Sequence, residues 1–178
     1  MMRKYYIEGL EIKEKYRGFV RYMVAYSDAF SLIYFRYTEN ERQKMTTKRV
    51  KNTLKPFLLY SGRTLQWPGT ETMDTRHIYQ LALYRCHIDV LPALESVGCL
   101  WDWDYPKHPM DLCFYREGYA WFWSVTHEGM NMLYIDQPSM ISDLESVGLE
   151  FHYEGNAELS ELYYDKRTIH EFPKLENS

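Results

Sequence analysis

The sequence predicts an α+β domain in which about three short helices pack on one antiparallel or mixed sheet. Stretches rich in aromatic and β-branched residues, typical of strands, recur along the chain, and short helix signals fall between them. The pentapeptide LESVG occurs twice, at 94–98 and at 144–148, each time after one predicted strand and before another. A chain of 178 residues fits one domain. We expect this single α+β domain over residues 1–156 and a polar helix or tail over residues 157–178.

Strand patterns dominate the beginning of the chain. The opening YYIEGLEI is strand-like, and side chains from Phe19 to Tyr26 alternate between two faces, as they would in an extended segment. A further strand is predicted over Phe30–Tyr37. The turn Tyr26–Ala29 would then join the two strands as a hairpin.

Three strand–helix–strand units are predicted to follow. Thr38 and Glu41 have the spacing of a capping box, so a basic helix is expected to begin there and to end before Pro56. The two LESVG copies would end the second and third helices, and all three helices would follow strands that end near Tyr37, Arg85 and Ile135.

Glycine closes both LESVG copies. Because glycine readily takes the left-handed conformation that ends a helix, we expect a positive φ at Gly98 and at Gly148. Between the first two helices, residues 57–67 predict a strand pair or a strand bent at Gly62, and residues 68–75 a polar loop.

An aromatic hairpin is predicted from Met110 to His127, with its turn at Arg116–Gly118. Alternation would place Tyr119, Trp121 and Trp123 on one face of its second strand.

The segment WDWDYP precedes this hairpin. If extended, it would place Trp101, Trp103 and Tyr105 on one face and Asp102 and Asp104 on the other. We expect a packed aromatic corner, with the aspartates of this segment and Asp111 bonded to loop backbone or facing a partner. A stacking platform for a base, or a protein contact surface, is the alternative.

Charge is divided along the chain, with +8 over residues 1–66 and −12 over residues 67–178. The first part would attract anions if the two parts face different directions, whereas interleaved charges would cancel in space.

No apolar stretch is long enough to span a bilayer and no signal peptide precedes the first strand, so we expect a cytoplasmic protein without membrane contact. The three cysteines have no metal-binding spacing and are expected to be buried free thiols.

Motifs for catalysis are missing from the sequence. It contains neither a phosphate-binding glycine loop nor a GxSxG elbow. Ser124 and His127 would point to opposite faces of a strand, which argues against a nucleophilic site. Asp102, Asp104 and Asp111, with His108 and His127, lack the spacing of a known metal motif. We therefore predict no catalytic residue, metal or cofactor.

The stretch WDWDYP…PMDLCFYREGYAWFWSVTHEG, together with YYIEGLE…YRGFVRYMVAYSDAFSLIYFRYTENE, resembles an uncharacterised family of small proteins from Bacillus relatives and their phages. Some members carry the label stage III sporulation protein AH, which is a membrane-anchored protein, whereas this chain has no spanning stretch. The hairpin is also similar to hairpins of small bacterial proteins found near toxin or phage-defence genes. The resemblance implies a defence or counter-defence setting and assigns no catalytic residues.

These observations favour a non-enzymatic binding protein that sequesters a small anionic, nucleotide-type ligand. Arg17 and Arg21 would share one face of a strand, and Lys48 and Arg49 lie on the basic helix, from which they could converge on phosphate. The predicted ligand-binding residues are Arg17, Arg21, Lys48, Arg49, Trp101, Trp103, Tyr105 and Trp121. A protein-blocking module, such as an immunity protein or inhibitor with an acidic aromatic face, is the alternative, and an undetected hydrolase is the third hypothesis. A homo-oligomer is left open.

Overall fold

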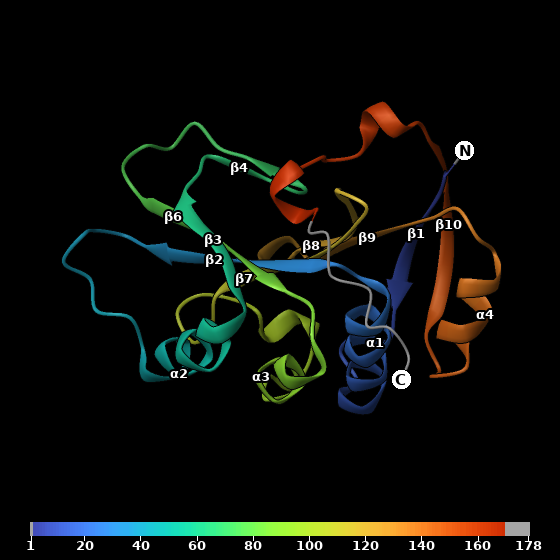
Figure 1. Ribbon diagram of the computed structural model, residues 1–178, viewed down its shortest axis with the longest axis horizontal. Helices are drawn as coiled ribbons and strands as arrows, with labels where there is room; N and C mark the ends of the chain where they lie inside the picture. The colour runs from blue at the N-terminus through green and yellow to red at the C-terminus, as the bar shows by residue number, and fades with distance from the viewer. Residues whose placement is uncertain (1, 170–178) are drawn as a thin grey trace, which may run out of the picture.

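An eight-stranded sheet, antiparallel at every strand pair, organises the chain in the computed structural model, which describes residues 2–169 (Figure 1). Its order is β10-β1-β9-β8-β7-β2-β6-β3. The strands are β1 (Met2–Glu8), β2 (Ala29–Arg36), β3 (Leu58–Arg63), β6 (Ile78–Arg85), β7 (Met110–Arg116), β8 (Tyr119–Val125), β9 (Met130–Ile135) and β10 (Glu150–Ala157). A separate two-stranded hairpin consists of β4 (Gln66–Trp67) and β5 (Thr70–Glu71).

Four α-helices accompany the sheet, together with six 3-10 turns in the described chain. The helices are α1 (Lys13–Tyr26), α2 (Met45–Leu54), α3 (Leu91–Glu95) and α4 (Ser139–Glu145). The 3-10 turns are η1 (Lys55–Phe57), η2 (Ile88–Val90), η3 (Leu100–Asp102), η4 (Thr126–Glu128), η5 (Leu159–Glu161) and η6 (Lys166–Thr168). None of the helices in residues 2–169 is long and apolar enough to cross a membrane. The predicted α+β class is confirmed, with an antiparallel sheet.

The strand–helix–strand units interleave with one another. Helices α2, α3 and α4 follow β2, β6 and β9, as predicted. In each unit the returning strand lies one strand away from the departing one: β2 and β3 flank β6, β6 and β7 flank β2, and β9 and β10 flank β1. Since each intervening strand is antiparallel to both neighbours, the two strands of a unit run in the same direction.

The first helix, α1, is where the strand prediction was wrong. Its buried side chains recur at helical spacing: Tyr16, Phe19, Val20, Met23 and Val24. Over the short window Phe19–Tyr26, apolar side chains are dense enough to satisfy strand alternation as well, and only the longer window separates the two periods. The predicted hairpin at Tyr26–Ala29 is therefore absent. Instead, α1 carries the chain from β1 to β2, and three strands (β9, β8 and β7) lie between these two in the sheet.

The start of α2 was also predicted wrongly. The helix begins at Met45, and its N-cap Lys44 makes no side-chain capping bond. Glu41 caps no helix because its carboxylate is used elsewhere, where it accepts hydrogen bonds from the Tyr37 backbone N–H (2.6 Å) and the Tyr105 hydroxyl. The capping-box pattern rests only on local spacing. Here the Glu41 carboxylate instead accepts a hydrogen bond from Tyr105, a residue distant in the sequence.

The two LESVG copies end α3 and α4 at equivalent positions. Leu94 and Leu144 are both fully buried. Gly148 has a φ of 86°, as predicted, but Gly98 does not have a positive φ. The chain beyond Gly98 enters η3 instead of reversing, and there the Leu100 N–H donates to the Leu10 carbonyl (3.0 Å). The same pentapeptide thus ends one helix in the left-handed conformation and the other without it.

Two apolar layers cover the sheet. The larger core lies under the helices, which Figure 1 shows below the sheet. The smaller core lies on the opposite face, under the β4–β5 hairpin.

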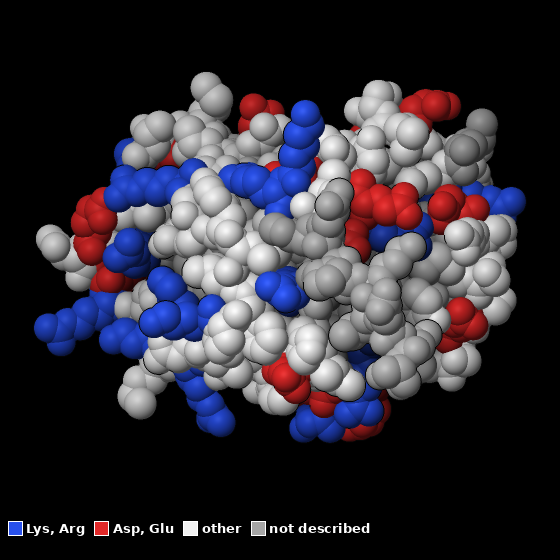
Figure 2. All heavy atoms as spheres, in the orientation of Figure 1, with Lys and Arg blue, Asp and Glu red and all other residues white. Residues whose placement is uncertain are grey.

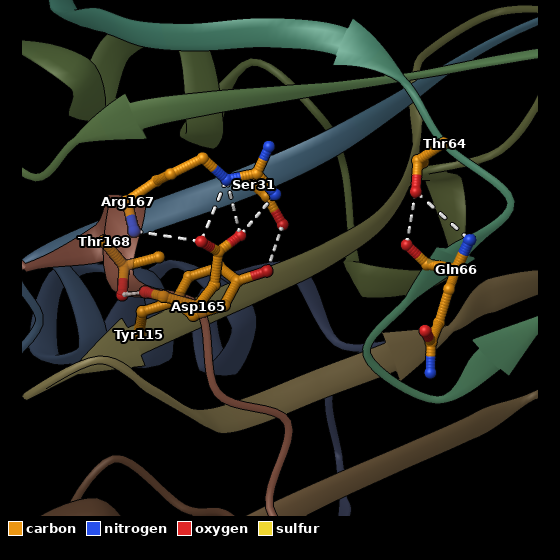
Figure 3. A network of polar contacts seen from close by, with 7 residues as sticks. All are labelled: Ser31, Thr64, Gln66, Tyr115, Asp165, Arg167 and Thr168. Carbon is orange, nitrogen blue, oxygen red and sulfur yellow. Dashed lines mark hydrogen bonds and ion pairs between the residues drawn. The ribbon is translucent and has the colours of Figure 1, made fainter.

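The segment 158–169, drawn in orange and red above the sheet in Figure 1, belongs to this second face. It is anchored by backbone bonds from Ala120 N–H to Tyr163 (2.9 Å) and from Asp165 N–H to Gly118 (2.9 Å). It contains two 3-10 turns in place of the predicted helix, while residues 170–178 of the predicted tail lie outside the described residues. Asp165 accepts several hydrogen bonds from Arg167 (Figure 3).

Candidate functional site

A hollow lined mostly by aromatic side chains lies on the second face of the sheet. It has a volume of about 450 Å³. We call it the aromatic hollow and define it by Phe35, Tyr37, Trp67, Tyr79 and Tyr105, with Met110 beneath them in the second core.

Strand alternation places two of these rings. Along β2, Leu32 and Tyr34 enter the helical core, so Phe35 faces the other way. Its cross-strand partner in β6 is Tyr79, with ring centroids 5.1 Å apart. Tyr105 meets Phe35 edge to face at 5.0 Å. Three segments that lie far apart in the sequence therefore form one aromatic cluster.

Trp67 closes the hollow from the β4–β5 hairpin and is held by a buried carboxylate. Its indole Nε1–H donates to Asp111 (2.8 Å), which also accepts from the backbone N–H (2.9 Å) and hydroxyl (3.0 Å) of Thr126. Asp111 lies at a bulge in β7 with a φ of 57°. Burial raises the pKa of this carboxyl, and the bonds from Thr126 and Trp67 oppose the shift. The expected backbone bonding of Asp111 is confirmed.

Glu41 fixes the Tyr105 side of the hollow. Its carboxylate accepts from the Tyr105 hydroxyl and the Tyr37 N–H, and these bonds lower its pKa. The Glu41 hydrogen bond, followed by burial, raises the pKa of Tyr105 to about 12. The hydroxyl of Thr47 in α2 donates to the Lys107 carbonyl (2.9 Å) in the same loop as Tyr105. The loop that follows β2 and the loop that precedes β7 are thereby bonded to each other, and the second loop is also bonded to α2.

Positive charge gathers beside the hollow. A shallow adjoining cleft of about 10 Å³ is lined by three cations, Arg36, Arg42 and Lys44, which we call the basic rim, and also by the Glu41 carboxylate. Phe35 and Tyr105 line both the cleft and the hollow. Arg42 and Lys44 make no ion pair within 4.0 Å with any residue in 2–169. Figure 2 shows several Lys and Arg at the end of the molecule where α2 lies, with Asp and Glu among them.

Negative charge lies within the hollow itself. Asp104 and Glu71 line it, together with His127, and no Lys or Arg does so among the described residues. The site therefore combines aromatic faces, carboxylate acceptors inside and cations at one side.

The predicted basic residues do not converge. Arg17 and Arg21 lie on α1, and Lys48 and Arg49 are exposed on α2, with α3 between the two helices (Figure 1). Arg21 already binds Glu95 of α3 through two bonds of 2.6 and 3.1 Å. The expected convergence rested on a strand that is in fact α1.

The WDWDYP segment is not extended, which corrects the predicted alternation. Leu100–Asp102 form η3, so Trp101, Trp103 and Tyr105 do not share a face. Trp103 is fully buried in the helical core and donates from Nε1 to the Tyr16 hydroxyl (2.7 Å), whereas Trp101 is half-buried. Only Tyr105 of these three reaches the aromatic hollow. The packed corner is confirmed for Trp103.

Trp121 and Trp123 do not share a face either. The pairing of β7 with β8 shifts between Phe114↔Phe122 and Tyr115↔Ala120, so Trp121 occupies a bulge. It enters the helical core beside Phe122, while Trp123 packs on the second face. The Trp121 indole Nε1–H donates to Ser27 (2.8 Å), which makes it a structural residue.

The other candidate residues have ordinary structural partners. Ser124 is buried and donates to the Leu112 carbonyl (3.0 Å). Of the cysteines, Cys113 is buried, and burial raises its pKa, while Cys86 and Cys99 are half-buried. Three potential metal ligands, Glu8, Glu150 and His152, lie within 4.8 Å of one another at the exposed β1–β10 edge, away from the hollow.

Sequence reasoning missed most of the aromatic hollow. Phe35, Tyr79 and Trp67 lie on strands whose order in the sheet no local pattern reveals, and the available signal was only that aromatic side chains recur in these strands. Comparison of the chain with protein families, with curated proteins and with solved structures gave no match.

Proposed function

We propose that the protein binds a nucleotide-type ligand, with its planar ring in the aromatic hollow and its phosphate at the basic rim. The observation that carries the proposal is the continuity of the two surfaces through Phe35 and Tyr105. A nucleotide carries a π-face and an anionic group a few ångströms apart, and this site offers a partner for each.

The energetics of both parts favour such a ligand. Stacking of a base on an aromatic side chain contributes about 1–3 kcal/mol. A guanidinium binds phosphate oxygens through two parallel hydrogen bonds, and Arg36 and Arg42 provide such groups. The positive end of the α2 dipole at Lys44 adds to the attraction of an anion. A hollow of about 450 Å³ is within the range of small-molecule sites.

The proposed role is sequestration of the ligand. Aromatic rings and fixed charges bind and orient a nucleotide without supplying a nucleophile. The likeness of the aromatic hairpin to proteins found near phage-defence genes is the reason to propose a defence or counter-defence setting.

Calorimetric titration with GMP, AMP, CMP, UMP and inorganic phosphate tests the proposal. At least one nucleotide should bind more tightly than phosphate alone. Tyr37→Ala should weaken that binding at least fivefold because a stacking face is lost. The matched control is Tyr26→Ala, since both tyrosines are 52% exposed and Tyr26 lies on α1, which packs on the opposite face of the sheet from the hollow. This control should bind like the wild type.

The basic rim has its own pair of variants. Arg42→Ala should weaken nucleotide binding and make it less sensitive to added salt, because one screened ion contact with the phosphate is lost, whereas Lys13→Ala on α1 should leave both properties unchanged. The proposal is refuted if no nucleotide binds at millimolar concentration. It is also refuted if tetramethylammonium binds in the hollow while nucleotides do not, since a small organic cation suits aromatic faces with nearby carboxylates.

A further inference from the structure

The carboxylate of Asp104 has unused hydrogen-bonding capacity at the aromatic hollow. The side chain is half-buried and lines the hollow. Its Oδ1 accepts from the Tyr105 N–H (2.9 Å), and its Oδ2 has no hydrogen-bond partner among residues 2–169. An ionised carboxylate accepts about four hydrogen bonds, so Asp104 can take further N–H donors from a ligand.

The position of Asp104 is set by its own loop. Its N–H donates to the Asp102 carbonyl (2.8 Å), and its carbonyl accepts from the His108 N–H (3.0 Å). Tyr105, the next residue, is held in turn by Glu41. The acceptor and the neighbouring aromatic ring are therefore placed before a ligand arrives, which reduces the entropy lost on binding.

We propose that the ring bound in the hollow is guanine, and that Asp104 selects it; this inference rests on the nucleotide-binding function proposed above. Guanine presents two adjacent donors, N1–H and the N2 amino group, which match the two oxygens of one carboxylate. Adenine and cytosine place a ring-nitrogen acceptor beside their amino group, and uracil flanks its single N–H with two carbonyl oxygens. Each of those acceptor atoms would face an oxygen of the Asp104 carboxylate and be repelled by it.

The absence of Lys and Arg from the described lining of the hollow supports this choice. A cation there would favour the acceptor edges of the other bases, whereas Asp104 and Glu71 favour donors. A base with the wrong edge would leave the half-buried Asp104 carboxylate without the hydrogen bonds that it loses from water, which disfavours that base.

The test compares GMP with IMP, which lacks only the N2 amino group, and with AMP, by calorimetry on the full chain. GMP should bind at least tenfold more tightly than either. Asp104→Asn should abolish this preference by lowering the affinity for GMP at least tenfold and changing that for AMP less than threefold. The amide still accepts from the Tyr105 N–H through its oxygen, so the loop should keep its shape, and an unchanged Tm verifies it.

The matched control is Asp102→Asn, two residues away and exposed. It should leave the affinities for GMP and AMP unchanged. The inference is overturned if GMP, IMP and AMP bind equally well, or if Asp104→Asn weakens all three by one factor; in both cases nucleotide binding itself stands. If none of the three binds, the proposed function fails together with the inference.

Discussion

Removing the Trp103 side chain should be among the most damaging single changes in the core. Trp103 is fully buried beneath the helices, and its indole N–H donates to the Tyr16 hydroxyl (2.7 Å), which donates onward to the Leu94 carbonyl (3.0 Å). Trp103→Ala leaves a large cavity and should lower the free energy of unfolding by about 3–5 kcal/mol. For a chain of this length that corresponds to a fall in Tm of about 6–20 °C.

A graded series separates the sources of this loss. Trp103→Phe keeps a six-membered aromatic ring but removes the hydrogen bond from the indole N–H to Tyr16. The loss of that hydrogen bond should lower the free energy of unfolding by about 1 kcal/mol. Asp104→Asn, on the next residue, should stay within about 0.5 kcal/mol because its side chain is only half-buried and keeps its bond to the Tyr105 N–H.

Urea unfolding monitored by far-UV circular dichroism measures this series without using the tryptophan that is removed. The denaturant dependence of the unfolding free energy should be the same in all variants, so that shifts in the midpoint report stability. A loss below about 1 kcal/mol for Trp103→Ala, at unchanged denaturant dependence, would refute its assignment as a core residue.

Two further predictions concern the backbone at the LESVG copies and the buried carboxylate. Gly148→Ala should destabilise the protein by about 1–2 kcal/mol because Gly148 has a φ of 86°, whereas Gly98→Ala should cost less because its new Cβ meets only the mobile end of Asp102; the reverse order of Tm losses would contradict this. Burial raises the pKa of Asp111, so its contribution to stability is complete below the unfolded-state value of about 4 and is lost as the pH rises through the folded-state value. The unfolding free energy of the wild type relative to Asp111→Asn should therefore increase between pH 7 and pH 4; a difference that is constant or falls would show that the folded-state pKa is not raised.

Local signals predicted those elements whose length and boundaries leave one interpretation. The hairpin β7–β8 has an unmistakable turn, Glu117–Gly118, between two apolar runs. The repeated LESVG marks two helix ends because its leucine is fully buried in both copies, although only Gly148 takes the left-handed conformation expected of both glycines. Alternation failed for α1, since a densely apolar segment satisfies the periods of a helix and of a strand over eight residues.

Bulges explain why the faces of the aromatic strands were mispredicted. Trp121 is the additional residue of the bulge in β8, so its side chain lies on the same face of the sheet as that of Phe122. The bulge also shifts the alternation of side chains in the part of β8 that precedes it. Nothing in the sequence YAWFWSV marks that position, because a bulge depends on the pairing with β7. The same holds for Asp111, whose positive φ serves its bonds to Trp67 and Thr126.

The sequence by itself determined the α+β class, the three strand–helix–strand units after β2 and the concentration of positive charge in the first part of the chain, because these depend on composition and short-range periodicity. Only the tertiary structure decided that Phe35, Tyr79, Trp67 and Tyr105 form one hollow beside the basic rim. Those residues come from two strands, a hairpin and a loop, and the order β7-β2-β6-β3 that brings their elements together is set by long-range pairing. Contacts between residues tens of positions apart are chosen by the packing of the whole sheet, and no local pattern contains that information.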